Sequence, residues 1–123
     1  MKAYLLVFLG AGLGGVLRHG VNLAALRLGS NFPWGTLGIN VIGSVLMGVV
    51  TGWLALRTGS PQARLFVATG ILGGFTTFST FSLETVALIE RGDVAAAMAY
   101  VLASLVAGIG GLALALIVMR HVL

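Results

Sequence analysis

A dense polar run interrupts an otherwise apolar part of the chain. Glycines and hydroxyl side chains dominate residues 73–82, which read Gly-Gly-Phe-Thr-Thr-Phe-Ser-Thr-Phe-Ser. The run lies within the charge-free segment 65–83, whose midpoint is Gly74. Glycine weakens a helix, and Thr and Ser hydroxyls offer the backbone other hydrogen bonds. The run therefore predicts a helix broken near 73–77; the alternative is a continuous helix that uses small residues for close packing.

A broken helix can supply two kinds of ion ligand. Freed backbone carbonyls bind small cations, and the N-terminus of the second helix half favours an anion. Phe78 and Phe81 follow at a spacing of three residues and share a helix face. Because the edge of an aromatic ring carries partial positive charge, such rings can contact an anion without a formal charge. Phe residues at helical spacing also serve ordinary packing, so both interpretations remain open.

Further polar side chains recur at helical spacing in two other segments. The stripes comprise Thr36, Asn40, Ser44, Gly48 and Gly52, then Tyr100, Ser104, Gly108 and Gly111. The amide of Asn40 can donate to an anion or bridge two helices. Tyr100 and Ser104 can donate into the same path or only pack, whereas Gly48 and Gly52 favour packing.

The first apolar segment carries one cation. Arg18 stands toward its end, after the pairs Gly10/Gly14 and Ala11/Gly15, which suit close helix contacts. An arginine here can face a water-filled vestibule and attract anions, or extend to lipid headgroups.

The composition of the chain is that of a membrane protein. Of 123 residues, 59% are hydrophobic and 8% are charged, and none is cysteine. So few charges exclude an ordinary water-soluble enzyme, and the lack of cysteine excludes thiol chemistry and a disulfide scaffold. The charge-free intervals predict an all-α membrane protein of one domain, residues 1–123. Its four transmembrane helices are expected at about 3–26, 33–56, 63–90 and 94–120, with Asp93 capping the last.

The basic residues are scattered, which argues against a nucleic-acid surface. With four spans, one side holds Lys2, Arg57, Arg64 and Arg120, and the other holds Arg27, Arg91 and, if counted, Arg18. So small a bias hardly selects one orientation. The topology is then either fixed by other features or dual, with copies inserted both ways and paired as an antiparallel homodimer.

Carboxylates are nearly absent. The chain has only Glu84, Glu90 and Asp93, and none lies in the first, second or fourth expected span. Because proton-coupled transport normally needs a protonatable group deep in the membrane, the pattern favours passive conduction.

Three motifs together resemble one known family. They are Gly14-Gly15-Val16-Leu17-Arg18, then Pro33-Trp34-Gly35-Thr36-Leu37-Gly38-Ile39-Asn40, and the run from Gly73 to Thr85. The chain resembles the Fluc fluoride channels, also called CrcB, over essentially its full length, with the same size and four-span layout. The run Gly-Gly-x-Thr-Thr-Phe-Ser-Thr-Phe is the most specific of the three motifs.

The resemblance implies a passive, selective fluoride channel rather than an enzyme. Family members are antiparallel, dual-topology homodimers with two pores that export fluoride across the inner (plasma) membrane of prokaryotes and protect against its toxicity. The matching pore residues are Asn40, Phe78, Phe81, Thr80, Ser82, Glu84, Tyr100 and Ser104, with Arg18 in the vestibule. The backbone carbonyls of Gly73 and Thr76, one set from each subunit, would hold a central structural Na⁺. The expected partners are fluoride, a second copy of the chain and membrane lipid. Gly108 departs from the pattern, since some relatives carry another Ser there.

Two other functions compete with this one. A small multidrug-type exporter also has four spans, but that class relies on a membrane-embedded Glu in its first helix, and this chain has none there. A non-transporting membrane assembly subunit would use the polar stripes only for packing. Neither alternative accounts for the hydroxyls gathered around the glycine pair.

Overall fold

The computed structural model describes residues 1–57 and 59–123, and within them every regular element is helical. The elements are α1 (Lys2–Leu26), α2 (Trp34–Leu56), α3 (Pro61–Ala63), η1 (Arg64–Leu72), α4 (Gly73–Phe75), α5 (Phe78–Glu90) and α6 (Val94–Val122). The stretch from α3 to α4 is one helical rod whose middle, η1, is π-helical, and α5 continues it after a break. In this described part of the chain, four helices are long and apolar enough to cross a membrane, as the sequence predicts.

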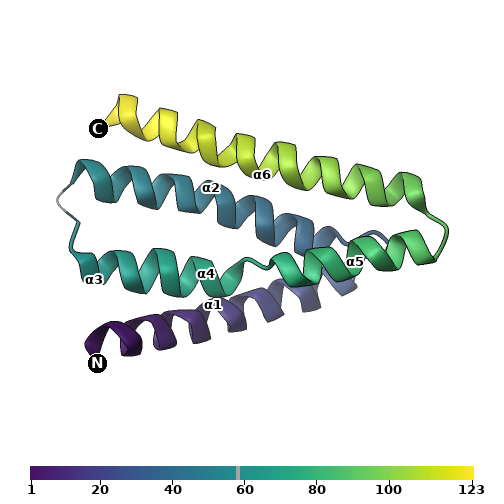
Figure 1. The fold of residues 1–123 in the computed structure, drawn as a ribbon, viewed down its shortest axis with the longest axis horizontal. Coiled ribbons are helices and arrows are strands. Elements are labelled where there is room, and N and C mark those ends of the chain that lie inside the picture. Colours follow the sequence, from purple (N-terminus) through teal and green to yellow (C-terminus); the bar gives the residue numbers. More distant parts are fainter. Residues whose placement is uncertain (58) are drawn as a thin grey trace.

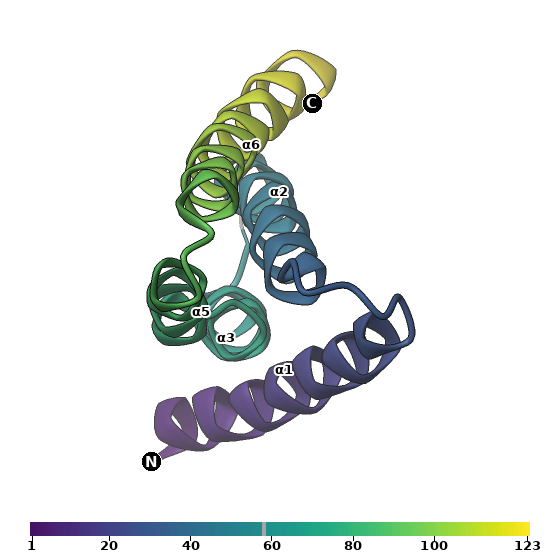
Figure 2. The same ribbon diagram turned by 90° about the vertical axis from the view of Figure 1, so that its right-hand side faces the viewer.

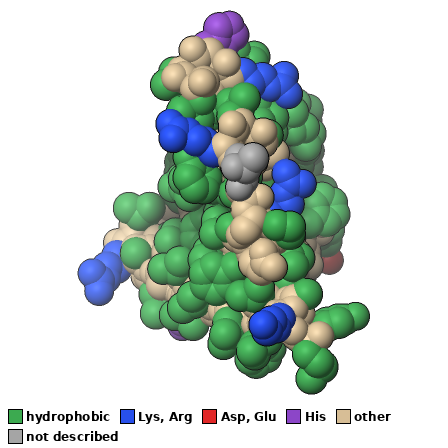
Figure 3. Space-filling view, turned by 90° about the vertical axis from the view of Figure 1, so that its left-hand side faces the viewer, with side chains coloured by type: hydrophobic (Ala, Val, Ile, Leu, Met, Phe, Trp, Pro, Cys, Tyr) green, Lys and Arg blue, Asp and Glu red, His purple; other side chains and the backbone are tan. Residues whose placement is uncertain are grey.

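The helices form a bundle with two distinct ends. Both chain termini and the start of α3 lie at one end, called the terminal end here, while the α1–α2 and α5–α6 connections lie at the other, the loop end (Figure 1). Helices α2 and α6 lie side by side, and α1 crosses beneath the third span on the far side of the bundle from α6 (Figure 2). Lys and Arg side chains are spread over the terminal end among hydrophobic ones (Figure 3). This distribution fits basic side chains at the water interface of a membrane protein.

Close backbone approach joins α1 to the third span. A Cβ built at Gly10 would lie 2.8 Å from Cα of Gly70, and a Cβ built at Gly74 would lie 2.8 Å from Cα of Ala11. Such distances leave no room for a side chain, so these glycines serve helix packing. On the other side of the bundle Gly48 of α2 meets α6 in the same way, with a built Cβ 2.8 Å from Cβ of Ala115.

The third span opens only at two threonines. Thr76 (φ −76°, ψ 156°) and Thr77 (φ −151°, ψ 119°) are extended, whereas Gly73 and Gly74 stay helical. The Oγ1 atom of Thr77 accepts from the N–H of Thr80 at 3.2 Å and so caps α5. The break thus falls inside the expected window of 73–77 but is narrower, because Gly74 packs against Ala11 of α1 and the chain stays helical through Phe75.

The last helix begins as the sequence predicts. The Oδ1 atom of Asp93 accepts from the N–H of Ala96 at 3.1 Å, which confirms Asp93 as its N-cap. The second helix starts at Trp34, directly after Pro33.

Candidate functional site

One side chain of α2 holds the break in the third span. The Nδ2 of Asn40 donates to the carbonyl of Thr77 at 3.0 Å, and the N–H of Thr77 donates to Oδ1 of Asn40 at 2.8 Å. In a continuous helix that N–H would instead donate to the carbonyl of Gly73. Asn40 therefore bridges two helices and replaces hydrogen bonds that the break removes. The bond to the Thr77 carbonyl uses only one of its two amide N–H donors.

A hollow of about 300 Å³ lies beside this bridge, and we call it the mid-span hollow. Its lining includes Asn40, Ser44, Phe78, Phe81 and Ser104. The Oγ of Ser104 is buried and has no hydrogen-bond partner among residues 1–57 and 59–123. A buried hydroxyl without a partner is unfavourable unless a ligand or water takes up its hydrogen bond. The hollow thus collects an amide donor, an unengaged hydroxyl and two aromatic rings.

The two phenylalanines differ in their surroundings. Their ring centroids lie 5.7 Å apart, so the shared face that the sequence predicts is present. Phe81 packs against the buried cluster of Leu88, Ala97 and Tyr100, whereas Phe78 is 79% exposed. A single chain therefore leaves most of the Phe78 ring uncovered.

The carboxylate of Glu84 is engaged at both oxygens. Thr36 Oγ1 donates to Oε1 at 2.9 Å, and Tyr100 OH donates to Oε2 at 2.7 Å. Both donors are fully enclosed, with exposed fractions of 1% for Thr36 and 0% for Tyr100. The ring of Tyr100 lies 5.1 Å from that of Phe81, centroid to centroid. Glu84 is thus fixed in place and connected through Tyr100 to the mid-span hollow.

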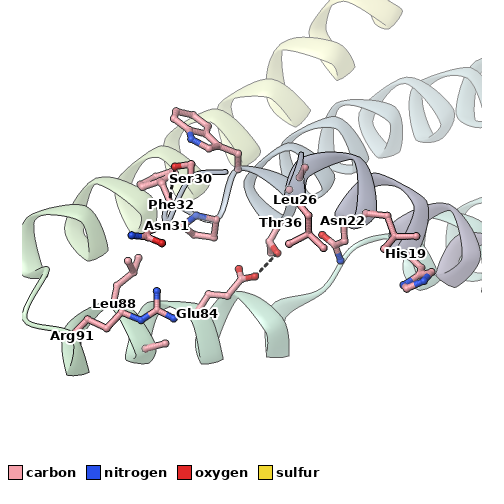
Figure 4. A pocket seen from close by; sticks show the side chains of 16 residues that line it. His19, Asn22, Leu26, Ser30, Asn31, Phe32, Thr36, Glu84, Leu88 and Arg91 are labelled. Atoms are coloured by element: carbon pink, nitrogen blue, oxygen red, sulfur yellow. Dashed lines mark hydrogen bonds between the residues drawn. The ribbon is translucent and has the colours of Figure 1, made fainter. Parts of the chain in front are cut away.

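A second hollow, of about 520 Å³, opens at the loop end between α1, the start of α2 and α5, and we call it the loop-end hollow (Figure 4). Its polar lining consists of His19, Asn22, Ser30, Asn31, Thr36, Glu84 and Arg91. The Arg91 side chain extends toward Glu84, which also carries the hydrogen bond from Thr36 (Figure 4).

The two hollows share no lining residue, and three residues in contact lie between them. Phe81 lines the mid-span hollow, Glu84 lines the loop-end hollow, and Tyr100 contacts both of these residues. Polar groups and aromatic rings therefore follow one another from the loop end to the middle of the bundle. Glu84 takes up the hydroxyl hydrogens of Thr36 and Tyr100, so the donors that remain available, on Asn40 and Ser104, lie at the mid-span hollow. Such donors can replace part of the hydration shell of a small anion.

Residues 5–116 match the family model described as CrcB-like protein, Camphor Resistance (CrcB). The chain belongs to the CrcB family. A relative from Methylobacterium nodulans, named fluoride-specific ion channel FluC, is 66% identical over 118 residues, which cover 95% of this chain and 95% of the relative. A relative of the same name from Granulibacter bethesdensis is 57% identical over 122 residues, which cover 98% and 96%. The family is one of ion channels, so this CrcB protein is not an enzyme.

Most positions that the CrcB resemblance assigns to the pore come together. Asn40, Phe78, Phe81 and Ser104 line the mid-span hollow, and Glu84 and Tyr100 adjoin it. Thr80 and Ser82 line neither hollow: Thr80 Oγ1 accepts from Thr77 Oγ1 at 3.1 Å, and Ser82 Oγ donates to the carbonyl of Phe78 at 2.9 Å within its own helix.

The remaining assigned positions of this CrcB chain lie at the break. Arg18 lines neither hollow, and its Nη1 donates to the Thr76 carbonyl at 3.4 Å. Gly73 is exposed, and its carbonyl lacks its usual helical partner because the N–H of Thr77 donates to Asn40.

Thr36 and Arg91 were not among the expected site residues. Thr36 precedes Asn40 by one helical turn on the same stripe, and that spacing was the available signal. Arg91 gave no such signal, because it belongs to the α5–α6 turn and reaches the hollow only through the fold.

Proposed function

We propose that this chain is a passive, fluoride-selective ion channel that exports fluoride across the inner (plasma) membrane of a prokaryotic cell and protects it from fluoride toxicity. The observation that carries the proposal is the mid-span hollow, where the Asn40 amide, the unengaged Ser104 hydroxyl and the rings of Phe78 and Phe81 face one space. Membership in the CrcB family, with relatives named fluoride-specific ion channels, supplies the identity of the ion.

The ion chemistry suits these groups. Fluoride is small and holds water tightly, so a pore must offer several donors and still release the ion. The second N–H of Asn40, the hydroxyl of Ser104 and the ring edges of Phe78 and Phe81 supply partial positive charge without a trapping cation. Glu84 acts as a positioning residue: it accepts the hydroxyl hydrogen of Tyr100 and so holds the Tyr100 ring beside that of Phe81.

The working unit in this proposal is an antiparallel, dual-topology homodimer with two pores. Phe78 is 79% exposed beside the mid-span hollow, and a second copy of the chain would supply the missing wall. The terminal end holds only two more basic residues than the loop end, which has Arg27 and Arg91, and so small a bias is compatible with insertion in both orientations. Membrane lipid surrounds the remaining apolar faces.

A structural Na⁺ at the dimer centre completes the proposal, held by the carbonyls of Gly73 and Thr76 from both subunits. Backbone carbonyls freed at a helix break are the ligands that bind Na⁺ in broken-helix transporters. The Gly73 carbonyl lacks its helical partner, and the Thr76 carbonyl accepts only a long bond from Arg18, of 3.4 Å. When bound, the ion would add positive field at the centre and tie the two broken helices together.

Liposome efflux tests the function directly. Purified protein in liposomes should release fluoride, read with a fluoride electrode, and should not release chloride in parallel runs. Phe81→Ile should cut the fluoride flux in a folded dimer, whereas Phe8→Ile, at a 73% exposed ring on α1, should not. Absence of fluoride efflux from folded, Na⁺-supplied protein would overturn the function and favour an assembly subunit.

A further inference from the structure

Ser44 also lines the mid-span hollow, and the pathway above does not use its hydroxyl. Ser44 lies on α2 one turn after Asn40, and because α2 runs from the loop end to the terminal end, Ser44 is nearer the terminal end. It lines the hollow together with Ser104 of α6. The two hydroxyls are not bonded to each other, since Ser104 Oγ has no partner in the described part of the chain.

The facing helix leaves space beside this hydroxyl. Helices α2 and α6 run in the same direction, and Ser44 lies level with Gly108. A Cβ built at Gly108 would have a single close neighbour among the described residues, Ser44 Oγ at 3.6 Å. That distance is ordinary van der Waals contact, so a small side chain at position 108 fits without displacing its neighbours. Gly108 thus keeps the space next to the Ser44 hydroxyl open.

We propose that Ser44 is a further fluoride donor, which acts together with Ser104 on the terminal-end side of the Phe78–Phe81 pair. The inference rests on the proposed fluoride-channel function. An ion that leaves the ring edges and the Asn40 amide toward the terminal end needs another donor before bulk water replaces its shell. The Ser44 hydroxyl lies one turn further along that route, and two hydroxyls that face one space can both donate to one small anion.

Deleting the hydroxyl should slow fluoride and spare the fold. In liposome efflux, Ser44→Ala should lower the fluoride rate about 2- to 10-fold, the effect of one lost neutral hydrogen bond on a barrier. Thr51→Val removes a hydroxyl from the same helix at a position that lines neither hollow, so its rate should equal that of the parent. Equal rates for the parent and Ser44→Ala would overturn the inference.

Moving the hydroxyl to α6 separates donation from packing. A Cβ at position 108 would lie 3.6 Å from the place of the Ser44 Oγ, and a serine hydroxyl is one bond from its Cβ. Adding Gly108→Ser to Ser44→Ala therefore puts a new hydroxyl beside the lost one, and the fluoride rate should return toward that of the parent. Adding Gly108→Ala to Ser44→Ala supplies the same volume without a donor and should leave the rate low. Recovery with alanine as well as with serine would assign Ser44 to packing and overturn the inference.

A second readout does not depend on the folding of Ser44→Ala. The chain has no cysteine, so Ser44→Cys carries a unique thiol of nearly the same size. If Ser44 faces the ion path, Ag⁺, a small ion that binds thiolates tightly, should reach this thiol and block the remaining fluoride flux, while the cysteine-free parent should not respond. Equal flux of Ser44→Cys with and without Ag⁺ would overturn the inference, even if Ser44→Ala does not fold.

Different results would refute the channel function and the role of Ser44. If the parent and Thr51→Val both lack fluoride flux, the channel function itself is wrong. If both conduct fluoride and Ser44→Ala conducts equally well, the function stands and only the role of Ser44 is refuted.

Discussion

Replacing Asn40 by alanine should destabilise the fold at the break in the third span. The two bonds from Asn40 to Thr77, at 2.8 and 3.0 Å, serve a residue that is only 7% exposed. A buried polar group left without a partner costs about 1–3 kcal/mol, so losing both bonds costs about 2–6 kcal/mol. Because Asn40 lines the mid-span hollow, water entering the vacated space can satisfy part of this loss. We therefore expect the free energy of unfolding to fall by about 2–3 kcal/mol.

Equilibrium unfolding in mixed micelles, driven by a denaturing detergent, measures this change. The protein concentration must be equal for all variants, since dimerisation raises the apparent stability. Thr51→Ala is the matched control, because it also truncates a polar side chain of α2 and should stay within about 0.5 kcal/mol of the parent. If Asn40→Ala and Thr51→Ala unfold with equal free energies, the reasoning that Asn40 holds the break is refuted.

Three further predictions concern packing, the cation and the topology. Gly10→Ala should cost about 1–3 kcal/mol by overpacking, because its new Cβ would lie 2.8 Å from Cα of Gly70. Gly12→Ala has no neighbour within 4 Å and should be neutral in the same unfolding assay; equal costs would contradict the packing account. Exchanging Na⁺ for a bulky organic cation should lower fluoride flux or dimer stability, and no effect would remove the Na⁺ site. Tags at the C-terminus should be accessible from both sides of the cell membrane, and strictly one-sided access would reject dual topology.

The four helices follow from the sequence because they depend on local properties. Charge-free length sets each span, and an Asp before the last helix sets its start, as the bond from Asp93 to Ala96 shows. The sequence also predicts which glycines serve helix packing, since small residues at helical spacing suit a close neighbour on any other helix. It does not predict which neighbour that is, so the contact of Gly10 with Gly70 became known only from the structure.

The details of the break do not follow from the sequence. The glycine pair has the weaker helix propensity, yet the chain opens at Thr76 and Thr77. Gly74 stays helical because it packs against Ala11, and Thr77 opens because Asn40, distant in sequence, takes both of its backbone groups. Both determinants are tertiary contacts, and they override propensity.

The role of Ser82 in the candidate site also does not follow from the sequence. Its hydroxyl belongs to the polar run, but it donates to the carbonyl of Phe78 and lines neither hollow. A Ser on a helix can satisfy itself in this way at any position, so spacing alone does not separate a pore hydroxyl from a self-bonded one.

Asn40 links the fold to the proposed pathway, and this double role limits what its variants can show. One N–H of its amide holds the Thr77 carbonyl, and the other is free to donate to an ion. Any substitution that removes the amide donors also removes the bond to the Thr77 carbonyl, so a loss of flux at Asn40 mixes two causes. The hydroxyls of Ser44 and Ser104 line the same hollow, and Ser104 Oγ has no partner among the described residues. Their removal takes away a donor while the bonds from Asn40 to Thr77 stay in place, so these serines separate ion binding from folding.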